Sequence, residues 1–188
     1  MLAPVPARKR ATARVTTRGG DRGDTSLFGK GRVRKTDPRI AALGDLDEAQ
    51  SALGVARAQS SGTVAALILE LQRGLYVAMA EVATLAADRS GLPQRLDAVA
   101  IATLDERSAA LKATTDIEGV FVVPGEDPLS AALDLARTVV RRAERQVVAL
   151  ADAGTVDGEH LVPWINRLSD VVFVLARSVE GRHRRASG

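Results

Sequence analysis

The sequence predicts an all-α fold, an up-and-down bundle of five helices, and two observations carry that prediction. Hydrophobic residues make up 46% of the chain but aromatic residues only 3%, so the core must be built from small aliphatic side chains, which favour closely packed helices. Short links rich in Gly, Pro and Ser separate the long segments, which suits antiparallel neighbours, and no strand pairs are evident. With 188 residues the chain is long enough for one domain with a core of its own.

Local signals bound the expected helices. Asp37-Pro38 and Asp127-Pro128 each combine a capping carboxylate with a proline suited to the first turn. The first pair opens a helix that runs to about residue 59, and the second opens one that runs to about residue 152. The other helices are expected at about residues 63–88, 94–115 and 159–180, and residues 120–125 should form a short extended segment closed by a turn. The last helix has apolar residues at the alternating spacings of four and three that are typical of a bundle seam: Leu161, Ile165, Leu168, Val172, Leu175 and Val179.

Charge is unevenly distributed along the chain. Residues 1–40 contain eleven Lys or Arg and three Asp or Glu, although the whole chain has a net charge of only +3. We expect residues 1–15 to be a disordered extension, 16–181 a single helical domain and 182–188 a basic tail. A basic arm on a mildly acidic body is compatible with nucleic acid or with a phosphate-bearing small ligand.

The composition excludes several kinds of chemistry. Without cysteine there can be no disulfide scaffold, thiol catalysis or Cys-based zinc site. His160 and His183 lack metal-ligand spacing, so no metal site of the protein's own is expected.

The longest apolar stretch, around residues 63–87, is interrupted by charged residues, so we expect no membrane span. The first fifteen residues lack the apolar region of a secretory signal, and they are rich in Arg and Ala, as mitochondrial leaders are.

The sharpest candidate cluster lies in the predicted helix 128–152. Arg137, Arg141 and Arg145 follow one another at intervals of four residues, and Glu144 lies on the same stripe. Arginines repel one another at this spacing, and a bound polyanion would remove that repulsion because guanidinium groups bind phosphate oxygens in a fork. The alternative is a solvated charged face on which Asp134 and Glu144 are the local partners.

Two further groups are candidates on weaker grounds. Asn166 lies between seam residues and could bind an amide or hydroxyl of a ligand, but it could equally be a surface asparagine. Asp45, Asp47 and Glu48 could pair with the arginine stripe or could form an ordinary acidic face.

Residues 16–32 read T-T-R-G-G-D-R-G-D-T-S-L-F-G-K-G-R, with five glycines. Such a stretch could be a disordered tail that binds nucleic acid or an ordered loop that holds an anion. The R-G-G triplet occurs once and only Phe28 could stack on a base, which weakens the nucleic-acid interpretation. Glycines allow backbone N–H groups to approach phosphate oxygens closely, which favours the loop.

Three blocks resemble the PduO-type ATP:corrinoid adenosyltransferases and occur in that family's order. The first combines T-x-x-G-D-x-G-x-T-S-L-F-G, R-V-x-K-x-D-P-R and G-x-x-D-E-x-x-S-A-L-G in residues 16–57. The second, in residues 121–150, joins F-V-V-P-G to A-R-T-V-V-R-R-A-E-R-Q-V-V-A-L. The third is N-R-L-S-D-V-V-F-V-L-A-R near residues 165–177.

This resemblance implies a five-helix bundle that assembles as a homotrimer with active sites between subunits. It implies transfer of the 5′-deoxyadenosyl group of ATP to Co(I) of a corrinoid such as cobalamin, with release of triphosphate, and Mg²⁺ arriving with the nucleotide. We expect a cytoplasmic enzyme, or one of the mitochondrial matrix if the basic N-terminal extension is a leader. A cobalamin reductase and an adenosylcobalamin-dependent enzyme are expected partners; nucleic acid and membrane are not.

The resemblance also implies roles for particular residues. Arg137 is expected to pair with Asp47 of a neighbouring subunit, and Phe121 to help displace the lower axial ligand of cobalamin. Arg141 is expected to bind the phosphates of ATP. The expected catalytic set is Asp47, Phe121, Arg137 and Arg141. The expected ATP contacts are Thr17, Arg18, Gly19, Gly20, Thr25, Ser26, Lys35, Arg141, Glu144, Arg145 and Asn166.

The arm departs from the family pattern at two places. Gly19 replaces a threonine, and Asp24 places a carboxylate where the loop nears phosphate, where it should repel triphosphate unless it faces Mg²⁺ or solvent. Gln50 stands where asparagine is common. These departures leave open an alternative: a carrier or regulatory paralogue that binds corrinoid or ATP with little catalysis.

Overall fold

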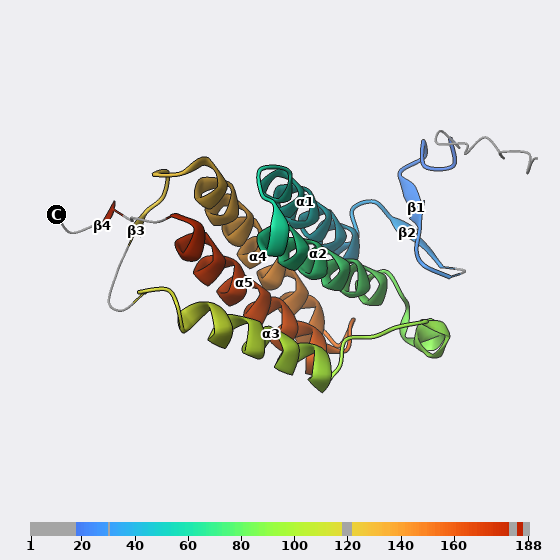
Figure 1. The fold of residues 1–188 in the computed structure, drawn as a ribbon. Helices are drawn as coiled ribbons and strands as arrows, with labels where there is room; N and C mark the ends of the chain where they lie inside the picture. Colours follow the sequence, from blue (N-terminus) through green and yellow to red (C-terminus); the bar gives the residue numbers. More distant parts are fainter. Residues whose placement is uncertain (1–17, 30, 118–121, 181–183, 186–188) are drawn as a thin grey trace, which may run out of the picture.

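The computed structural model describes residues 18–29, 31–117 and 122–180, and the backbone of 184–185. This part of the chain is mostly helical (Figure 1). The helices are α1 (Pro38–Ala58), α2 (Gly62–Val82), the 3-10 helix η1 (Ala86–Gly91), α3 (Ala98–Lys112), α4 (Pro128–Asp152) and α5 (Gly158–Glu180). The strands are β1 (Asp24–Ser26), β2 (Arg32–Arg34), β3 (Val122–Val123) and β4 (Arg184–Arg185).

Helix α4 lies at the centre of the helical packing. It packs against both α1 and α5, while α2 packs on α1 and also contacts α5, and α3 packs on α5 (Figure 1). The core between them is aliphatic, as the composition predicted, and its largest fully buried side chains include Leu46, Leu53, Leu133 and Leu168. Five of the six predicted seam residues of α5 are buried, and the sixth, Val179, is partly buried.

The capping signals predicted two helix starts correctly. Asp37 accepts a hydrogen bond from the backbone N–H of Arg39 at 2.8 Å, and α1 begins at Pro38. Asp127 accepts from the N–H groups of Leu129 and Ser130 at 2.8 and 3.0 Å, and α4 begins at Pro128. A carboxylate at these positions satisfies amide groups that have no partner within the helix.

Two of the predicted helices are shorter in the structure. The helix expected at 63–88 ends at Val82, because the chain becomes extended at Leu85 before it enters η1. The helix expected at 94–115 begins only at Ala98, where Asp97 caps it, since the N–H of Leu96 donates to the buried Glu81 carboxylate at 2.6 Å. A tertiary hydrogen bond thus sets this boundary.

The expectation of no strand pairs is wrong. β1 pairs with β2 and β3 with β4, both antiparallel. These strands have two or three residues each, which is too short for an alternating pattern to reveal them.

Among the described helices, α2 is the one that is long and apolar enough to cross a membrane by length and composition alone. By this criterion the charged residues do not exclude α2, and the expectation of no membrane span stays a prediction. However, 33% of the apolar window is buried inside the structure, and a core helix passes the same test.

Gly74 on α2 allows α5 to approach closely. An ideal Cβ at this position would lie 2.1 Å from Cζ2 of the buried Trp164. We expect Gly74→Ala to lower the free energy of unfolding by about 1–3 kcal/mol, because overpacking forces the ring or the helix to move. Urea unfolding followed by circular dichroism measures the change. The matched control is Gly44→Ala on α1, where an added Cβ meets nothing within 4 Å and should be neutral or stabilising. Equal unfolding midpoints for both variants would contradict the prediction.

Candidate active site

The glycine-rich arm forms a β-hairpin that projects from one end of the helical body (Figure 1). Thr25 lies opposite Val33, and Ser26 lies opposite Arg32. The turn between the strands is closed by the N–H of Leu27, which donates to the carbonyl of Gly31 at 2.9 Å. Gly29 has φ = 103°, a conformation that favours glycine.

The hairpin carries a small, open cavity of about 260 Å³. Four of the predicted ATP contacts line it, together with two charged residues: Gly19, Gly20, Asp24, Thr25, Ser26 and Arg32. Lys35 lies beside it, since an ideal Cβ on Gly20 would be 3.1 Å from the Lys35 Nζ. Arg18 precedes the cavity with φ = 58°, and Thr17 lies outside the described residues. The structure thus gathers glycines, hydroxyl groups and an ammonium group in one place.

Asp24 has a partner in the hairpin. Its carboxylate lies 3.2 Å from Nη1 of Arg34, which is the residue directly opposite on β2. The same guanidinium group donates to the carbonyl of Arg22 at 2.9 Å. An arginine of the hairpin itself therefore offsets the charge of Asp24, because the pairing of β1 with β2 places Arg34 opposite it.

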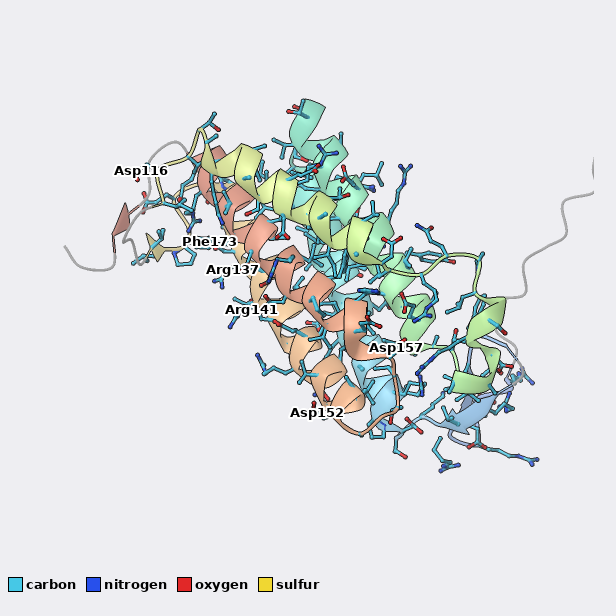
Figure 2. The ribbon with its side chains drawn as sticks, turned by 90° about the horizontal axis from the view of Figure 1, so that it is seen from below. Asp116, Arg137, Arg141, Asp152, Asp157 and Phe173 are labelled. Carbon is cyan, nitrogen blue, oxygen red and sulfur yellow. The ribbon has the colours of Figure 1, made fainter. Side chains whose placement is uncertain are left out.

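Arg141 and Arg145 are exposed on α4, and Nη1 of Arg145 donates to the backbone carbonyl of Arg141 at 3.0 Å. Figure 2 shows Arg137 and Arg141 on the same side of the helical body, pointing outward. Among the described residues, no carboxylate forms an ion pair with Arg141 or Arg145. Two guanidinium groups one helical turn apart are thus available to an anion.

Two residues of the acidic face of α1, Asp45 and Glu48, pair with an arginine outside the stripe. Arg142, which is next to the stripe, lies 3.4 Å from the Asp45 carboxylate and also binds Glu48. The hydrogen bond to Glu48 raises the pKa of the Arg142 guanidinium. The suggestion that this face neutralises the stripe is therefore wrong for Asp45 and Glu48 within one chain, because one residue along a helix turns the side chain by about 100°.

Glu144 and Asn166 are neighbours, as a shared site requires. Nδ2 of Asn166 donates to Oε1 of Glu144 at 2.9 Å, across the α4–α5 contact. Nη1 of Arg167 donates to Oδ1 of Asn166 at 3.0 Å, and Nε of Arg167 donates to Asp105 of α3 at 3.0 Å. The amide of Asn166 is thereby held in one orientation. Asp105 was not predicted, because only the tertiary contact of α3 with α5 brings it to the site.

Arg137 is partly enclosed by its own chain. Its Nε lies 3.6 Å from the Asp134 carboxylate one turn earlier, and its guanidinium carbon lies 5.8 Å from the centre of the Phe173 ring. Asp134 also accepts a hydrogen bond from the buried Arg177 at 2.5 Å, and Arg177 lies 3.0 Å from the Glu180 carboxylate. Within one chain the local alternative for Arg137, pairing with Asp134, is the one observed.

The other members of the expected catalytic set are less defined. Asp47 is exposed on α1 and forms no ion pair with another described residue. Phe121 lies outside the described residues. In the described ranges no three His, Asp or Glu side chains come together in a way that could hold a metal ion.

The predicted ATP contacts form two groups. One is the hairpin cavity, which is anchored near the end of α2, where the N–H of Phe28 donates to the carbonyl of Ala83 at 3.0 Å. The other is the α4–α5 face, which carries Arg141, Glu144 and Asn166. The two groups lie apart in a single chain, since Figures 1 and 2 show the hairpin at one end and Arg141 along the side of α4.

Fold and site together define a helical protein with a glycine-rich hairpin and an arginine face suited to phosphate. A family model described as cobalamin adenosyltransferase matches residues 15–179, and the chain belongs to this family. It is 39% identical over 169 residues to the corrinoid adenosyltransferase of Mycobacterium tuberculosis, and this alignment covers 87% of each chain. It is 37% identical to the corrinoid adenosyltransferase of Citrobacter freundii. It is also similar to a PduO-type ATP:corrinoid adenosyltransferase variant from Lactobacillus reuteri complexed with cobalamin and ATP, with a TM-score of 0.84 and 28% identity. That comparison covers 93% of this chain and 100% of the other.

Proposed function

We propose that this chain transfers the 5′-deoxyadenosyl group of ATP to Co(I) of a corrinoid such as cobalamin, forming adenosylcobalamin and triphosphate. The observation that carries the proposal is the family match over residues 15–179, which spans both the hairpin and the arginine face. Curated relatives over most of this length are corrinoid adenosyltransferases.

The chemistry asks for positioning rather than for a protein nucleophile. Co(I) attacks C5′ of ATP, a Co–C bond forms, and the C–O bond to triphosphate breaks with its electron pair leaving on the phosphate oxygen. The protein must hold ATP in line and offset the charge of the leaving triphosphate. Arg141 and Arg145 supply fixed positive charge, and Lys35 and the backbone of Gly19 and Gly20 supply further donors. Mg²⁺ would arrive with the nucleotide, since the described residues offer no carboxylate cluster for it.

The separation of the two groups supports a site shared between subunits. In the proposed homotrimer of five-helix bundles, the hairpin of one subunit meets the α4–α5 face of the next, so that both groups contact the same ATP. Asp47 is exposed on α1 and would pair with Arg137 of the neighbouring subunit. Arg137 would then lie between two carboxylates, its own Asp134 and the incoming Asp47. Phe121 keeps its proposed role at the lower face of the corrinoid.

The relatives are bacterial, which favours a cytoplasmic enzyme that receives reduced corrinoid from a reductase and passes its product to an adenosylcobalamin-dependent enzyme.

The second candidate function is that of a carrier or regulatory paralogue. Gly19, which lacks the hydroxyl of the family's threonine, is the feature that favours it. Asp24 no longer favours it, because Arg34 offsets the charge of that carboxylate.

The proposal is tested by mixing the purified protein with ATP, Mg²⁺ and chemically reduced cob(I)alamin. We expect the absorption spectrum of adenosylcobalamin to appear, with one triphosphate released for each molecule formed. An unchanged spectrum, while a known adenosyltransferase works in the same buffer, would contradict enzyme activity. Tight cobalamin binding without transfer would select the carrier instead.

A further inference from the structure

Arg39, in the first turn of α1, is a buried arginine that the proposed chemistry does not use. Only 5% of it is exposed. Its guanidinium donates to three backbone carbonyls: those of Val82, Thr84 at 3.3 Å and Thr155 at 2.9 Å. These carbonyls belong to the end of α2, the segment just after it and the turn between α4 and α5.

The surroundings of Arg39 make this burial costly. Desolvation lowers the pKa of its guanidinium, and the nearby positive charge of Arg89 lowers it further, while Asp37 acts in the opposite sense. Arg89 also donates to the Thr155 carbonyl, at 3.3 Å. The three carbonyls offset part of this cost, because each accepts a hydrogen bond from the guanidinium group. The carbonyl of Val82, at the end of α2, has no partner within the helix and attracts positive charge.

The segment that Arg39 holds is the one on which the hairpin rests. The N–H of Phe28 donates to the carbonyl of Ala83, and Phe28 forms a parallel bridge with Thr84. The hairpin turn is also close to Leu85, since an ideal Cβ on Gly31 would lie 2.8 Å from its Cδ1. Thr84 itself is 1% exposed.

The C-terminal strand of the hairpin, β2, is also connected to Arg39, because α1 follows it in the chain. Strand β2 ends at Arg34, and α1 begins at Pro38 after the Asp37 cap. Arg39 therefore joins the helix that continues from β2 to the segment against which the hairpin turn docks. The guanidinium group of Arg39 thus connects the two places where the hairpin is attached to the helical body: the start of α1 and the segment that follows α2.

We propose that Arg39 is a positioning residue for ATP, which sets how the hairpin stands on the helical body by holding the carbonyls of Val82 and Thr84. This inference rests on the proposed function, because it assumes that the hairpin cavity holds part of the nucleotide. Arg39 acts through residues 83–85 and touches no substrate.

The test compares Arg39→Met and Arg39→Lys with Arg107→Met, an exposed arginine on α3 that pairs with Glu70. We expect Arg39→Met to raise KM for ATP by about tenfold or more, because the ordering of the hairpin must then be provided by ATP binding. KM for cob(I)alamin and kcat at saturating ATP should stay within about twofold of the wild type, since none of the three carbonyls that Arg39 binds belongs to Arg141, Glu144 or Asn166. Arg39→Lys should lie between, because an ammonium group cannot reach three carbonyls in the fork geometry of a guanidinium group.

Hydrogen exchange gives a readout that does not need activity. Amides of residues 18–29 should exchange faster in Arg39→Met, while those of α4 keep the wild-type rate. The proposal is overturned if KM for ATP and exchange in the hairpin are both unchanged and only the unfolding midpoint is lower. Arg39 would then stabilise the fold without positioning the hairpin. If Arg39→Met does not fold, the lysine variant decides by the same two measurements. An inactive wild type would contradict the proposed function. The exchange experiment would still test whether Arg39 orders the hairpin, because it does not depend on activity.

Discussion

Arg141→Ala should lower kcat/KM for adenosyl transfer by about a hundred- to a thousandfold, the effect typical of removing one donor that stabilises developing charge. Arg141 is exposed on α4 and forms no ion pair with the described part of the chain, so its charge is available to the triphosphate. The rate of adenosylcobalamin formation at several ATP concentrations measures the effect. The loss should include kcat, because negative charge shifts to the leaving triphosphate in the transition state.

The control for this experiment is Arg107→Ala, which removes an exposed arginine of α3 whose carboxylate partner is Glu70. Arg107→Ala should keep wild-type kinetics, and both variants should keep the wild-type circular dichroism spectrum and mass in solution. Wild-type turnover by Arg141→Ala would contradict the phosphate role of this residue.

Arg177→Met should lower the free energy of unfolding by about 3–5 kcal/mol, as is usual when one partner of a buried ion pair is removed. Its side chain is 2% exposed and lies within 3.0 Å of the carboxylates of both Asp134 and Glu180. Without it, two buried carboxylates are left with fewer donors: Arg137 at 3.6 Å for Asp134, and the Ser130 hydroxyl at 3.3 Å for Glu180. Urea unfolding monitored by circular dichroism measures the change.

The matched comparison is Arg107→Met, which breaks an ion pair whose side chains are more than 40% exposed. Exposed pairs contribute about 0–1 kcal/mol, so this variant should unfold close to the wild type. Equal midpoints for the two variants would show that the Arg177 cluster is not stabilising as a paired unit. Arg137 shares Asp134 and the Phe173 ring with Arg177, so loss of Arg177 should change the position of that catalytic candidate.

The helices were predictable where the signal is local. Asp37-Pro38 and Asp127-Pro128 fix two starts because the cap and the proline lie within the segment itself. The end of α2 and the start of α3 were missed, since these depend on an extended residue at Leu85 and on a hydrogen bond from Leu96 to Glu81. No pattern in the intervening residues records a contact between positions fifteen residues apart.

The site was predictable in a similar way. The family resemblance named Glu144 and Asn166 as ATP contacts, which stays a prediction, and the packing of α4 on α5 brings the two side chains together. Spacing could not tell which carboxylate pairs with which arginine, because Asp134 can reach Arg137 along the helix and Arg177 across it. The assembly that would bring the hairpin to Arg141 depends on a second copy, and it stays a prediction.

Trp164, which packs on Gly74, also determines how this molecule can be observed by fluorescence. It is the only tryptophan of the chain and is 3% exposed, so its emission reports the contact between α2 and α5. Because the chain has no cysteine, a single Arg22→Cys change in the exposed part of the hairpin provides a unique position for a dye. Unfolding of the body and rearrangement of the hairpin by ATP can then be recorded at two wavelengths in one sample, so that a loose hairpin is distinguished from an unfolded protein.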